Sequence, residues 1–231
     1  MKDLFLDLPN VEKVRARFQW LFANNKFVID KTGVKTVEII NGVFIADESV
    51  IFGTEDQSYI KRELEWYKSM SLSVNDIPPP IPEIWKRVAD KNGLIHSNYG
   101  WCIFSKDNHS QYDSCLAALK NDIDTRRATM IYTRPSIQQE YNRDGMSDFI
   151  CTNNVHFFIR NDQLISSVFM RSNDAVFGYK NDWSWHKHIQ EQLLNDLKGT
   201  YSNLVLGPII WNSGSIHVYE RHFKFLEKET K

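Results

Sequence analysis

The sequence predicts an α+β fold in which helices are mixed with antiparallel strand pairs. The dipeptide Asn41-Gly42 separates two short β-rich runs, and this pair is a strong hairpin signal because both residues tolerate a positive φ. Asn161-Asp162 joins a second pair of strand-like runs, 151–160 and 163–172. Strict strand–helix–strand alternation is absent. We therefore expect a mixed sheet packed with helices.

The remaining elements follow from periodicity and from helix-terminating residues. Apolar residues recur at helical spacing from position 11 to position 22, which predicts a first helix. Gly199 is expected to cap a late helix that begins at Trp183. The full expected order is a helix at 11–22, strands at 36–40 and 43–46, helices at 56–70 and 111–119, strands at 128–133, 151–160 and 163–172, a helix at 183–197, and strands at 203–211 and 215–220.

Length and composition indicate a single domain spanning residues 1–231. A chain of 231 residues that is 42% hydrophobic can bury one substantial core, and the proline cluster at positions 78–82 suits a surface connection within it. The formal net charge is -1, so no global field draws the chain to nucleic acid or to an anionic membrane. The longest apolar run, 204–211, is too short to span a bilayer. We expect a soluble, cytoplasmic protein without stable nucleic-acid binding.

The cysteines and histidines do not predict a metal centre. Three widely spaced cysteines, Cys102, Cys115 and Cys151, form no CxxC pair and no Cys/His zinc spacing. His186 and His188 are two positions apart on the predicted helix and cannot share a face, so they do not predict a metal site. We expect neither histidine to take part in catalysis. No metal cofactor is expected, and the cysteine pattern indicates a reducing compartment.

Glu63 is the most informative residue by periodicity. Ile60, Glu63, Tyr67 and Met70 form one helical stripe in which the other three members are apolar or aromatic, so the Glu63 carboxylate should point inward. A partly buried carboxylate has a raised pKa and can act as a general acid or base near neutral pH. An internal salt bridge is the alternative reading.

Cys151 begins a predicted strand, where a cysteine is commonly a small buried hydrophobe. As a nucleophile it would need positive charge nearby to favour the thiolate. Arg126, Arg127 and Arg171 are the candidates. The Arg126-Arg127 pair is either a surface basic pair or part of a phosphate clamp, and the clamp requires that it converge with Arg171. Asp182, directly before the predicted helix, would ordinarily be its N-cap.

Several motifs, taken together, resemble the thymidylate synthase superfamily, and especially its branch in T-even-like bacteriophages that hydroxymethylates deoxycytidylate. The resemblance runs from about Phe27 to His222. It is carried by DKTGVKTVEII, YIKRELEWYKS, HSNYGW, DTRRATMIYTRPS, DGMSDFICTNN, MRSNDAVFGYKND and SIHVYERHF. It implies a thymidylate synthase-like fold whose mixed sheet forms a homodimer interface.

The resemblance also implies roles for individual positions. Catalytic roles fall on Cys151 as nucleophile, Glu63, Tyr99 and Asp182. Nucleotide binding falls on Lys31, Arg126, Arg127, Arg171, Ser172, Asp182, His217 and Tyr219, with the Arg126-Arg127 pair supplied by the second subunit. Folate contacts fall on Asp174 and Trp85. Lys31 in place of an arginine, Thr152 in place of a histidine and a polar C-terminal tail depart from the thymidylate synthase pattern.

The implied reaction begins with addition of the Cys151 thiolate to C6 of deoxycytidylate, which makes C5 nucleophilic toward the one-carbon unit of 5,10-methylenetetrahydrofolate. Water then completes a 5-hydroxymethyl group and tetrahydrofolate is released. Asp182 matches the position that reads the base. The alternatives are a deoxyuridylate hydroxymethylase, a thymidylate synthase, a cytidylate enzyme, and a catalytically silent relative that binds nucleotide or RNA.

Overall fold

The protein is built around one mixed β-sheet, seen in a computed structural model that describes residues 7–29 and 33–227. Within those residues the strand order is β1-β2-β7-β5-β4-β3, and β6 pairs with the end of β7. β5 and β6 run parallel to β7, and the other pairs are antiparallel. The strands are β1 (Val28–Ile29), β2 (Lys35–Ile45), β3 (Thr129–Ile131), β4 (Thr152–Arg160), β5 (Gln163–Met170), β6 (Asn173–Asp174) and β7 (Val205–Tyr219).

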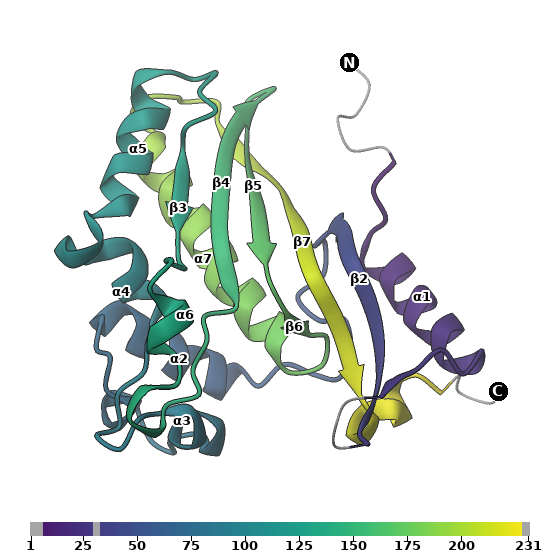
Figure 1. Cartoon of the computed structure of the whole chain (residues 1–231). Helices are drawn as coiled ribbons and strands as arrows, with labels where there is room; N and C mark the ends of the chain where they lie inside the picture. The colour runs from purple at the N-terminus through teal and green to yellow at the C-terminus, as the bar shows by residue number, and fades with distance from the viewer. Residues whose placement is uncertain (1–6, 30–32, 228–231) are drawn as a thin grey trace.

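Helices cover one face of this sheet and one of its ends. The long helix α7 lies behind β4, β5 and β7, while α1 lies beside β2 at the opposite edge from α4 and α5 (Figure 1). The α-helices are α1 (Val11–Ala23), α2 (Gln57–Ser69), α3 (Glu83–Val88), α4 (Tyr99–Phe104), α5 (Gln111–Asn121), α6 (Ile137–Glu140) and α7 (Gly178–Leu197). Short 3-10 segments are η1 (Val74–Asp76), η2 (Lys106–Asn108), η3 (Arg143–Gly145) and η4 (Glu220–Phe225). The architecture confirms the predicted α+β class.

The helix that carries Glu63 forms where its sequence predicts it. Asp56 caps α2 by accepting a hydrogen bond from Tyr59 N at 2.9 Å, and Met70 ends it in a left-handed conformation. Its buried side chains, which include Glu63 and Tyr67, lie on one stripe that faces α4 and α7. The predicted helix at 11–22 and the strand pair around Asn161-Asp162 are likewise confirmed.

Two strand predictions at the centre of the sheet were wrong. Asn41-Gly42 does not turn a hairpin, because β2 runs through it and pairs with β7 on both sides of it. β7 likewise continues through the residues that were expected to separate 203–211 from 215–220. Asn41 does adopt the positive φ that its sequence favours, at 53°. Pairing along the whole of β7 therefore outweighs the local turn preference.

A change in side-chain facing replaces the expected turn. The closely paired Phe44 and Trp211 are both buried on one side of Asn41, and the closely paired Val37 and Val218 are both buried on the other. Side chains of a regular strand alternate between faces, so even and odd positions would keep their faces throughout. In β7 the fully buried positions instead change from odd numbers, Trp211 and Ser213, to even numbers, Ile216 and Val218. In β2 the most buried positions change from Val37 to Phe44 across Asn41. We refer to this point as the kink of β2 and β7.

The start of α7 also differs from the prediction. The helix begins at Gly178 rather than Trp183, so Asp182 lies inside it and the N-cap interpretation of Asp182 is wrong. Two tertiary bonds hold the extra turn: Tyr179 Oη donates to Glu48 O and Lys180 Nζ donates to Thr54 O, each at 2.7 Å. At the other end the cap residue is Lys198, and Gly199 follows it without a left-handed φ.

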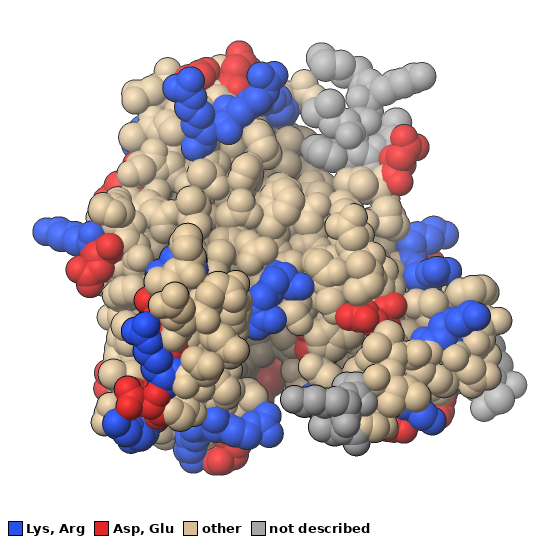
Figure 2. Space-filling model, viewed as in Figure 1, with Lys and Arg blue, Asp and Glu red and all other residues tan. Residues whose placement is uncertain are grey.

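The face of the sheet opposite α7 is open. Met130 and Val168 point into the core, so their neighbours Ile131 and Phe169 point to the open face, where they are 51% and 36% exposed. Figure 2 shows this face, on which charged side chains gather mainly toward the rim and leave much of the area over the strands uncharged. No helix among the described residues combines the length and apolar character needed to cross a bilayer.

Candidate active site

The structure brings together side chains from five separate segments at one end of the sheet. Cys151 directly precedes β4, and Arg171 directly follows β5. Glu63 comes from α2, Tyr99 from the first residue of α4, and Asp182 from α7. These residues are far apart in the sequence. Their convergence agrees with the set expected from the resemblance.

Cys151 lies beside one cationic side chain. Nη2 of Arg171 is 3.6 Å from Cys151 Sγ, and Arg171 N donates to Cys151 O at 2.8 Å. Burial raises the pKa of the Cys151 thiol to about 11, Arg171 opposes this shift, and Asp182 adds to it. The guanidinium also donates to Phe149 O at 2.6 Å and Ile150 O at 3.0 Å. Arg171 therefore holds the segment that leads into the cysteine.

Glu63 is buried, as its position on the helical stripe predicts, but its neighbours are aromatic rather than basic. Tyr59 Oη donates to Glu63 Oε1 at 2.7 Å, and Trp85 Nε1 donates to Tyr59 Oη at 3.3 Å. Burial raises the pKa of Glu63 to about 7, and hydrogen bonds from Tyr59, Trp85 and Tyr67 limit the rise. The internal salt bridge considered for Glu63 is not formed among the described residues. Its pKa suits proton transfer near neutral pH.

Asp182 receives one donor on each carboxyl oxygen. Tyr99 Oη donates to Oδ1 at 3.2 Å, and Asn173 Nδ2 donates to Oδ2 at 2.8 Å. Burial raises the pKa of Asp182 to about 8, and the nearby Glu63 raises it further, while Tyr99 and Asn173 lower it. Two carboxyl groups with raised pKa values therefore lie close together in this site, a pattern typical of functional sites.

His217, Tyr219 and Asp174 border the same site at the end of β7. The rings of His217 and Tyr219 are 4.7 Å apart. Burial lowers the pKa of His217 and raises that of Tyr219, and Arg171 makes a smaller contribution that lowers both. Asp174 Oδ1 accepts hydrogen bonds from Val176 N and Phe177 N, which turns the chain into α7. Its Oδ2 is 3.6 Å from Arg221 Nη2.

Not every predicted site residue joins this group within one protomer. Arg126 and Arg127 are exposed beyond the far end of β3. The adjacent Ala128 accepts a hydrogen bond from Phe157 N. Phe157 is six residues along β4 from Cys151, so at ~3.3 Å per residue the two lie roughly 20 Å apart. Ser172 directly follows Arg171 and is half-buried. Lys31 lies outside the described residues.

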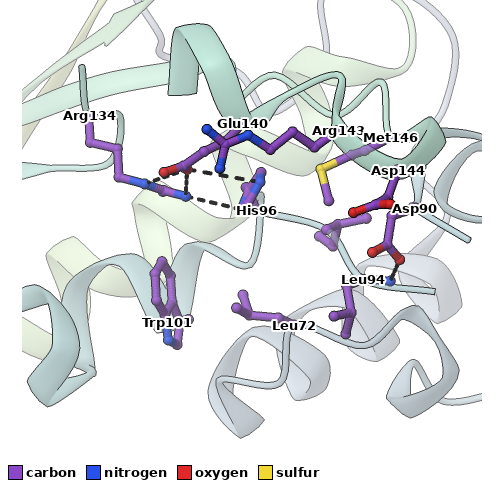
Figure 3. Close-up of a pocket in the computed structure, with 11 residues that line it drawn as sticks. Leu72, Asp90, Leu94, His96, Trp101, Arg134, Glu140, Arg143, Asp144 and Met146 are labelled. Carbon is purple, nitrogen blue, oxygen red and sulfur yellow. Dashed lines mark hydrogen bonds and ion pairs between the residues drawn. The ribbon is translucent and has the colours of Figure 1, made fainter. Parts of the chain in front are cut away.

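A separate cavity of about 450 Å³ lies outside the Cys151 segment. Figure 3 shows Arg134 and Glu140 pointing toward one another next to His96, with Trp101 on another wall. Arg134 Nη2 is 2.5 Å from Glu140 Oε2 and 3.0 Å from His96 Nδ1. The backbone N–H of His96 donates to Asp148 Oδ2 at 2.7 Å. These bonds link the chain before Tyr99 to the chain before Cys151.

Two contributors to the site were not foreseen. Asn173 was part of a matched motif but received no role, and His186 was set aside. His186 is buried, its Nε2 lies 3.3 Å from Thr152 Oγ1, and its ring stacks on Tyr99. Burial raises the pKa of Tyr99, and the nearby Thr152 opposes this rise. Periodicity gave no signal for either residue, because both contacts depend on how separate elements pack together. No group of three His, Cys, Asp or Glu side chains suited to a metal ion occurs within the described ranges.

The fold and this constellation define a thymidylate synthase-like enzyme. The structure is similar to that of thermostable thymidylate synthase A from Bacillus subtilis, with a TM-score of 0.68, 24% identity, and coverage of 94% of this chain and 82% of that one. The family model described as thymidylate synthase matches residues 21–231. The chain belongs to the thymidylate synthase family.

Relatives of two kinds match the sequence. The deoxycytidylate 5-hydroxymethyltransferases of Enterobacteria phages T4 and T6 are each 52% identical over 223 residues, which is 96% of this chain and 91% of theirs. The thymidylate synthase of Bacillus subtilis subsp. natto is 28% identical over 174 residues, 72% of this chain and 58% of that protein. The chain is thus more similar to these phage hydroxymethyltransferases than to this bacterial synthase.

Proposed function

We propose that this chain transfers a one-carbon unit from 5,10-methylenetetrahydrofolate to C5 of deoxycytidylate, with addition of water, to give 5-hydroxymethyl-deoxycytidylate and tetrahydrofolate. The 52% identity to phage enzymes named for this reaction supports the activity. The choice of cytosine as the base rests on one structural observation. The buried carboxyl group of Asp182 accepts hydrogen bonds from Tyr99 and Asn173.

Asp182 matches the hydrogen-bonding edge of cytosine. Its pKa of about 8 means that much of it is protonated at neutral pH. A protonated carboxyl group can donate its O–H to N3 of cytosine and accept an N–H from the exocyclic N4 amine. Uracil offers N3–H and O4 at the same edge, which is the opposite order of donor and acceptor. The protonated form can present its donor and acceptor in either order. The charged form only accepts, so it pairs with the N4 amine of cytosine but opposes O4 of uracil, and the site therefore favours cytosine over uracil.

Cys151 supplies the nucleophile in this proposal. Its Sγ forms a bond to C6 of the base, and electron density moves to C5, which then attacks the one-carbon unit. A thiol with a pKa of about 11 is mostly protonated in the free protein, so its proton must leave as the bond forms. Arg171, 3.6 Å away, stabilises the developing thiolate and lies where it can also meet the nucleotide phosphate.

The residues expected to meet folate fit its chemistry. When bound, 5,10-methylenetetrahydrofolate supplies the carbon at the formaldehyde oxidation level. Trp85 is a half-buried aromatic ring next to the Tyr59–Glu63 pair, and it can face a flat pterin. The Asp174 carboxylate can accept from the N–H groups of a pterin. The neighbouring Phe177 is 51% exposed and offers further aromatic surface.

Glu63 is assigned the proton transfers that complete the product. After C5 has lost its proton and the bond from the one-carbon unit to the folate nitrogen has broken with release of tetrahydrofolate, an exocyclic methylene group remains on the pyrimidine. Water then adds to its carbon. Glu63, with a pKa of about 7, can accept a proton from that water. Cys151 Sγ then leaves C6 and the aromatic ring is restored. The net change in the nucleotide is the gain of CH2O.

The proposal includes a homodimer with shared active sites. Its interface would be the open face of the sheet, where Ile131 and Phe169 are exposed. Exposed apolar side chains that cluster on one face are typical of protein interfaces. Within one protomer, Arg126 and Arg127 lie too far from Cys151 to bind the phosphate of a nucleotide held at that cysteine. We therefore expect them to bind the phosphate of the nucleotide in the partner's site. Subunit mixing tests this arrangement directly.

Product analysis tests the proposed activity. Parallel incubations with deoxycytidylate, cytidylate and deoxyuridylate, each with 5,10-methylenetetrahydrofolate, are analysed by mass spectrometry. We expect deoxycytidylate to gain CH2O and to release tritium from C5. A product that gains only a methylene group would instead identify methyl transfer. No change in any nucleotide would refute the proposal.

A further inference from the structure

Asn173 is a buried amide at the edge of the site, and the proposed reaction gives it no step of its own. It lies in the two-residue strand β6, opposite Ile216 of β7, and its side chain is 3% exposed. Its Nδ2 donates to Asp182 Oδ2 at 2.8 Å. Its Oδ1 is buried and has no hydrogen-bond partner among the described residues.

The unpaired oxygen makes Asn173 costly for the fold alone. Burial of a carbonyl oxygen without a partner is unfavourable, and buried polar groups in proteins are nearly always paired. An apolar residue of similar size would avoid this cost. We therefore expect the benefit of an amide at this position to come from its Nδ2 group, which donates to Asp182.

The two donors on Asp182 act on opposite oxygens. Tyr99 Oη engages Oδ1 and Asn173 Nδ2 engages Oδ2, which together fix the rotation of the carboxyl group about its last side-chain bond. Asp182 is inside α7 and caps no helix, so neither contact is explained by helix termination. Without Asn173, only one donor would orient the carboxyl plane.

We propose that Asn173 is a positioning residue for base recognition, whose amide Nδ2 holds Oδ2 of Asp182 so that the carboxyl group presents one fixed edge to the pyrimidine. This inference rests on the proposed function, in which Asp182 reads cytosine. It adds a residue that determines how sharply cytosine is distinguished from uracil. The Asn173 side chain itself does not need to touch the nucleotide.

The test compares Asn173→Leu and Asn173→Ser with the wild type. Leucine keeps the volume, removes the unpaired oxygen and removes the donor to Asp182. Serine is smaller and cannot span the same distance. Both variants should lose about ten- to a hundredfold in the ratio of kcat/KM for deoxycytidylate to that for deoxyuridylate, as expected when a hydrogen bond to an ionisable group is lost.

The pH profile separates positioning from a purely structural role. A hydrogen-bond donor stabilises the charged form of a carboxyl group, so loss of the Asn173 donor should raise the pKa of Asp182. The limb of the pH–activity profile that reports Asp182 should then move upward by about one pH unit. Gln190→Leu is the matched control. Gln190 is a fully buried amide on α7 that also has an unpaired oxygen, but it donates to Leu164 O and Gly207 O, away from Asp182. Its loss should leave the ratio and the pH limb unchanged.

The outcomes are distinct. If the wild type does not convert deoxycytidylate, the proposed function fails. If the wild type is active and either folded Asn173 variant keeps the wild-type ratio and pH limb, the positioning role is overturned while the proposed function stands. Thermal unfolding shows which variants are folded. If neither variant folds, Asn173 serves the fold and the inference is also overturned.

Discussion

Replacement of Asp182 by asparagine should move base preference from deoxycytidylate toward deoxyuridylate. The two side chains have nearly the same shape, so the change acts on hydrogen bonding and on the titratable proton rather than on packing. A protonated carboxyl group donates to N3 and accepts from N4 of cytosine. An amide can accept from N3–H of uracil and donate to O4, which reverses the match.

The surroundings of Asp182 also fix how the new amide would lie. Asn173 Nδ2 is a donor 2.8 Å from Oδ2, so an amide NH2 placed there would bring two donors together. The Tyr99 hydroxyl, 3.2 Å from Oδ1, can act as either donor or acceptor. The amide oxygen should therefore face Asn173 and the amide nitrogen should face Tyr99. One orientation is favoured, so the reversed preference should be well defined.

The size of the effect follows from the burial of the site. Mispairing one buried polar group costs about 1 to 3 kcal/mol, and ~1.4 kcal/mol corresponds to a tenfold change in kcat/KM. The ratio of kcat/KM for deoxycytidylate to kcat/KM for deoxyuridylate should fall about ten- to a hundredfold in Asp182→Asn. The measurement is steady-state kinetics with each nucleotide at saturating folate.

Asp196→Asn provides the control. Asp196 lies on the same helix and accepts a hydrogen bond from Tyr112 Oη at 2.6 Å, so it repeats the tyrosine–aspartate pair away from the site. This variant should keep the wild-type ratio. An unaltered ratio in Asp182→Asn would remove Asp182 from base recognition, and an equal shift in Asp196→Asn would show that the effect is not local.

The nucleophile, the buried acids and the arginine pair give further tests. Cys151→Ala should lose both hydroxymethyl transfer and C5 tritium release but bind nucleotide, whereas Cys102→Ala should stay active; tritium release by the former would exclude covalent catalysis. Glu63→Gln should lower kcat by about 10² to 10⁴ and remove the limb near pH 7, and a retained limb would assign it to another group. Asp182 binds its proton more tightly in the folded than in the unfolded chain, so its contribution to stability should fall as pH rises from 3.8 to about 8. Over this range the difference in thermal stability between wild type and Asp182→Asn should therefore shift in favour of the variant, and a difference that does not change with pH would contradict this. Arg126→Glu and Cys151→Ala, each inactive, should regain activity on mixing, and demonstrated subunit exchange without activity would exclude shared sites.

Local signals in the sequence predicted the elements that depend on local contacts. The helix carrying Glu63 has its cap at Asp56 and its apolar stripe in the sequence, and both are present in the structure. The inward direction of Glu63 followed from that stripe. The hairpin at Asn161-Asp162 followed from residues that accept a positive φ, which both adopt.

Long-range pairing decided the features that the sequence did not predict. The Asn41-Gly42 signal was outweighed because β7 offers β2 a continuous partner. The first turn of α7 depends on bonds from Tyr179 to a loop far away in the sequence. Asn173 reaches Asp182 only because β6 docks beside β7. Glu63 was also identified by its helical stripe, whereas the other site residues were identified through resemblance to a family.

The kink of β2 and β7 limits how this protein can change. Trp211 and His217 are both odd-numbered positions of β7, yet the first fills the core and the second borders the site with Tyr219. Insertion or deletion of one residue between Trp211 and His217 would place Ile216 or Val218 where His217 now borders the site. Surface loops often tolerate such length changes, but this stretch should not. Variation of the side chains that β7 presents to the site is thus confined to substitutions that keep the spacing of this strand.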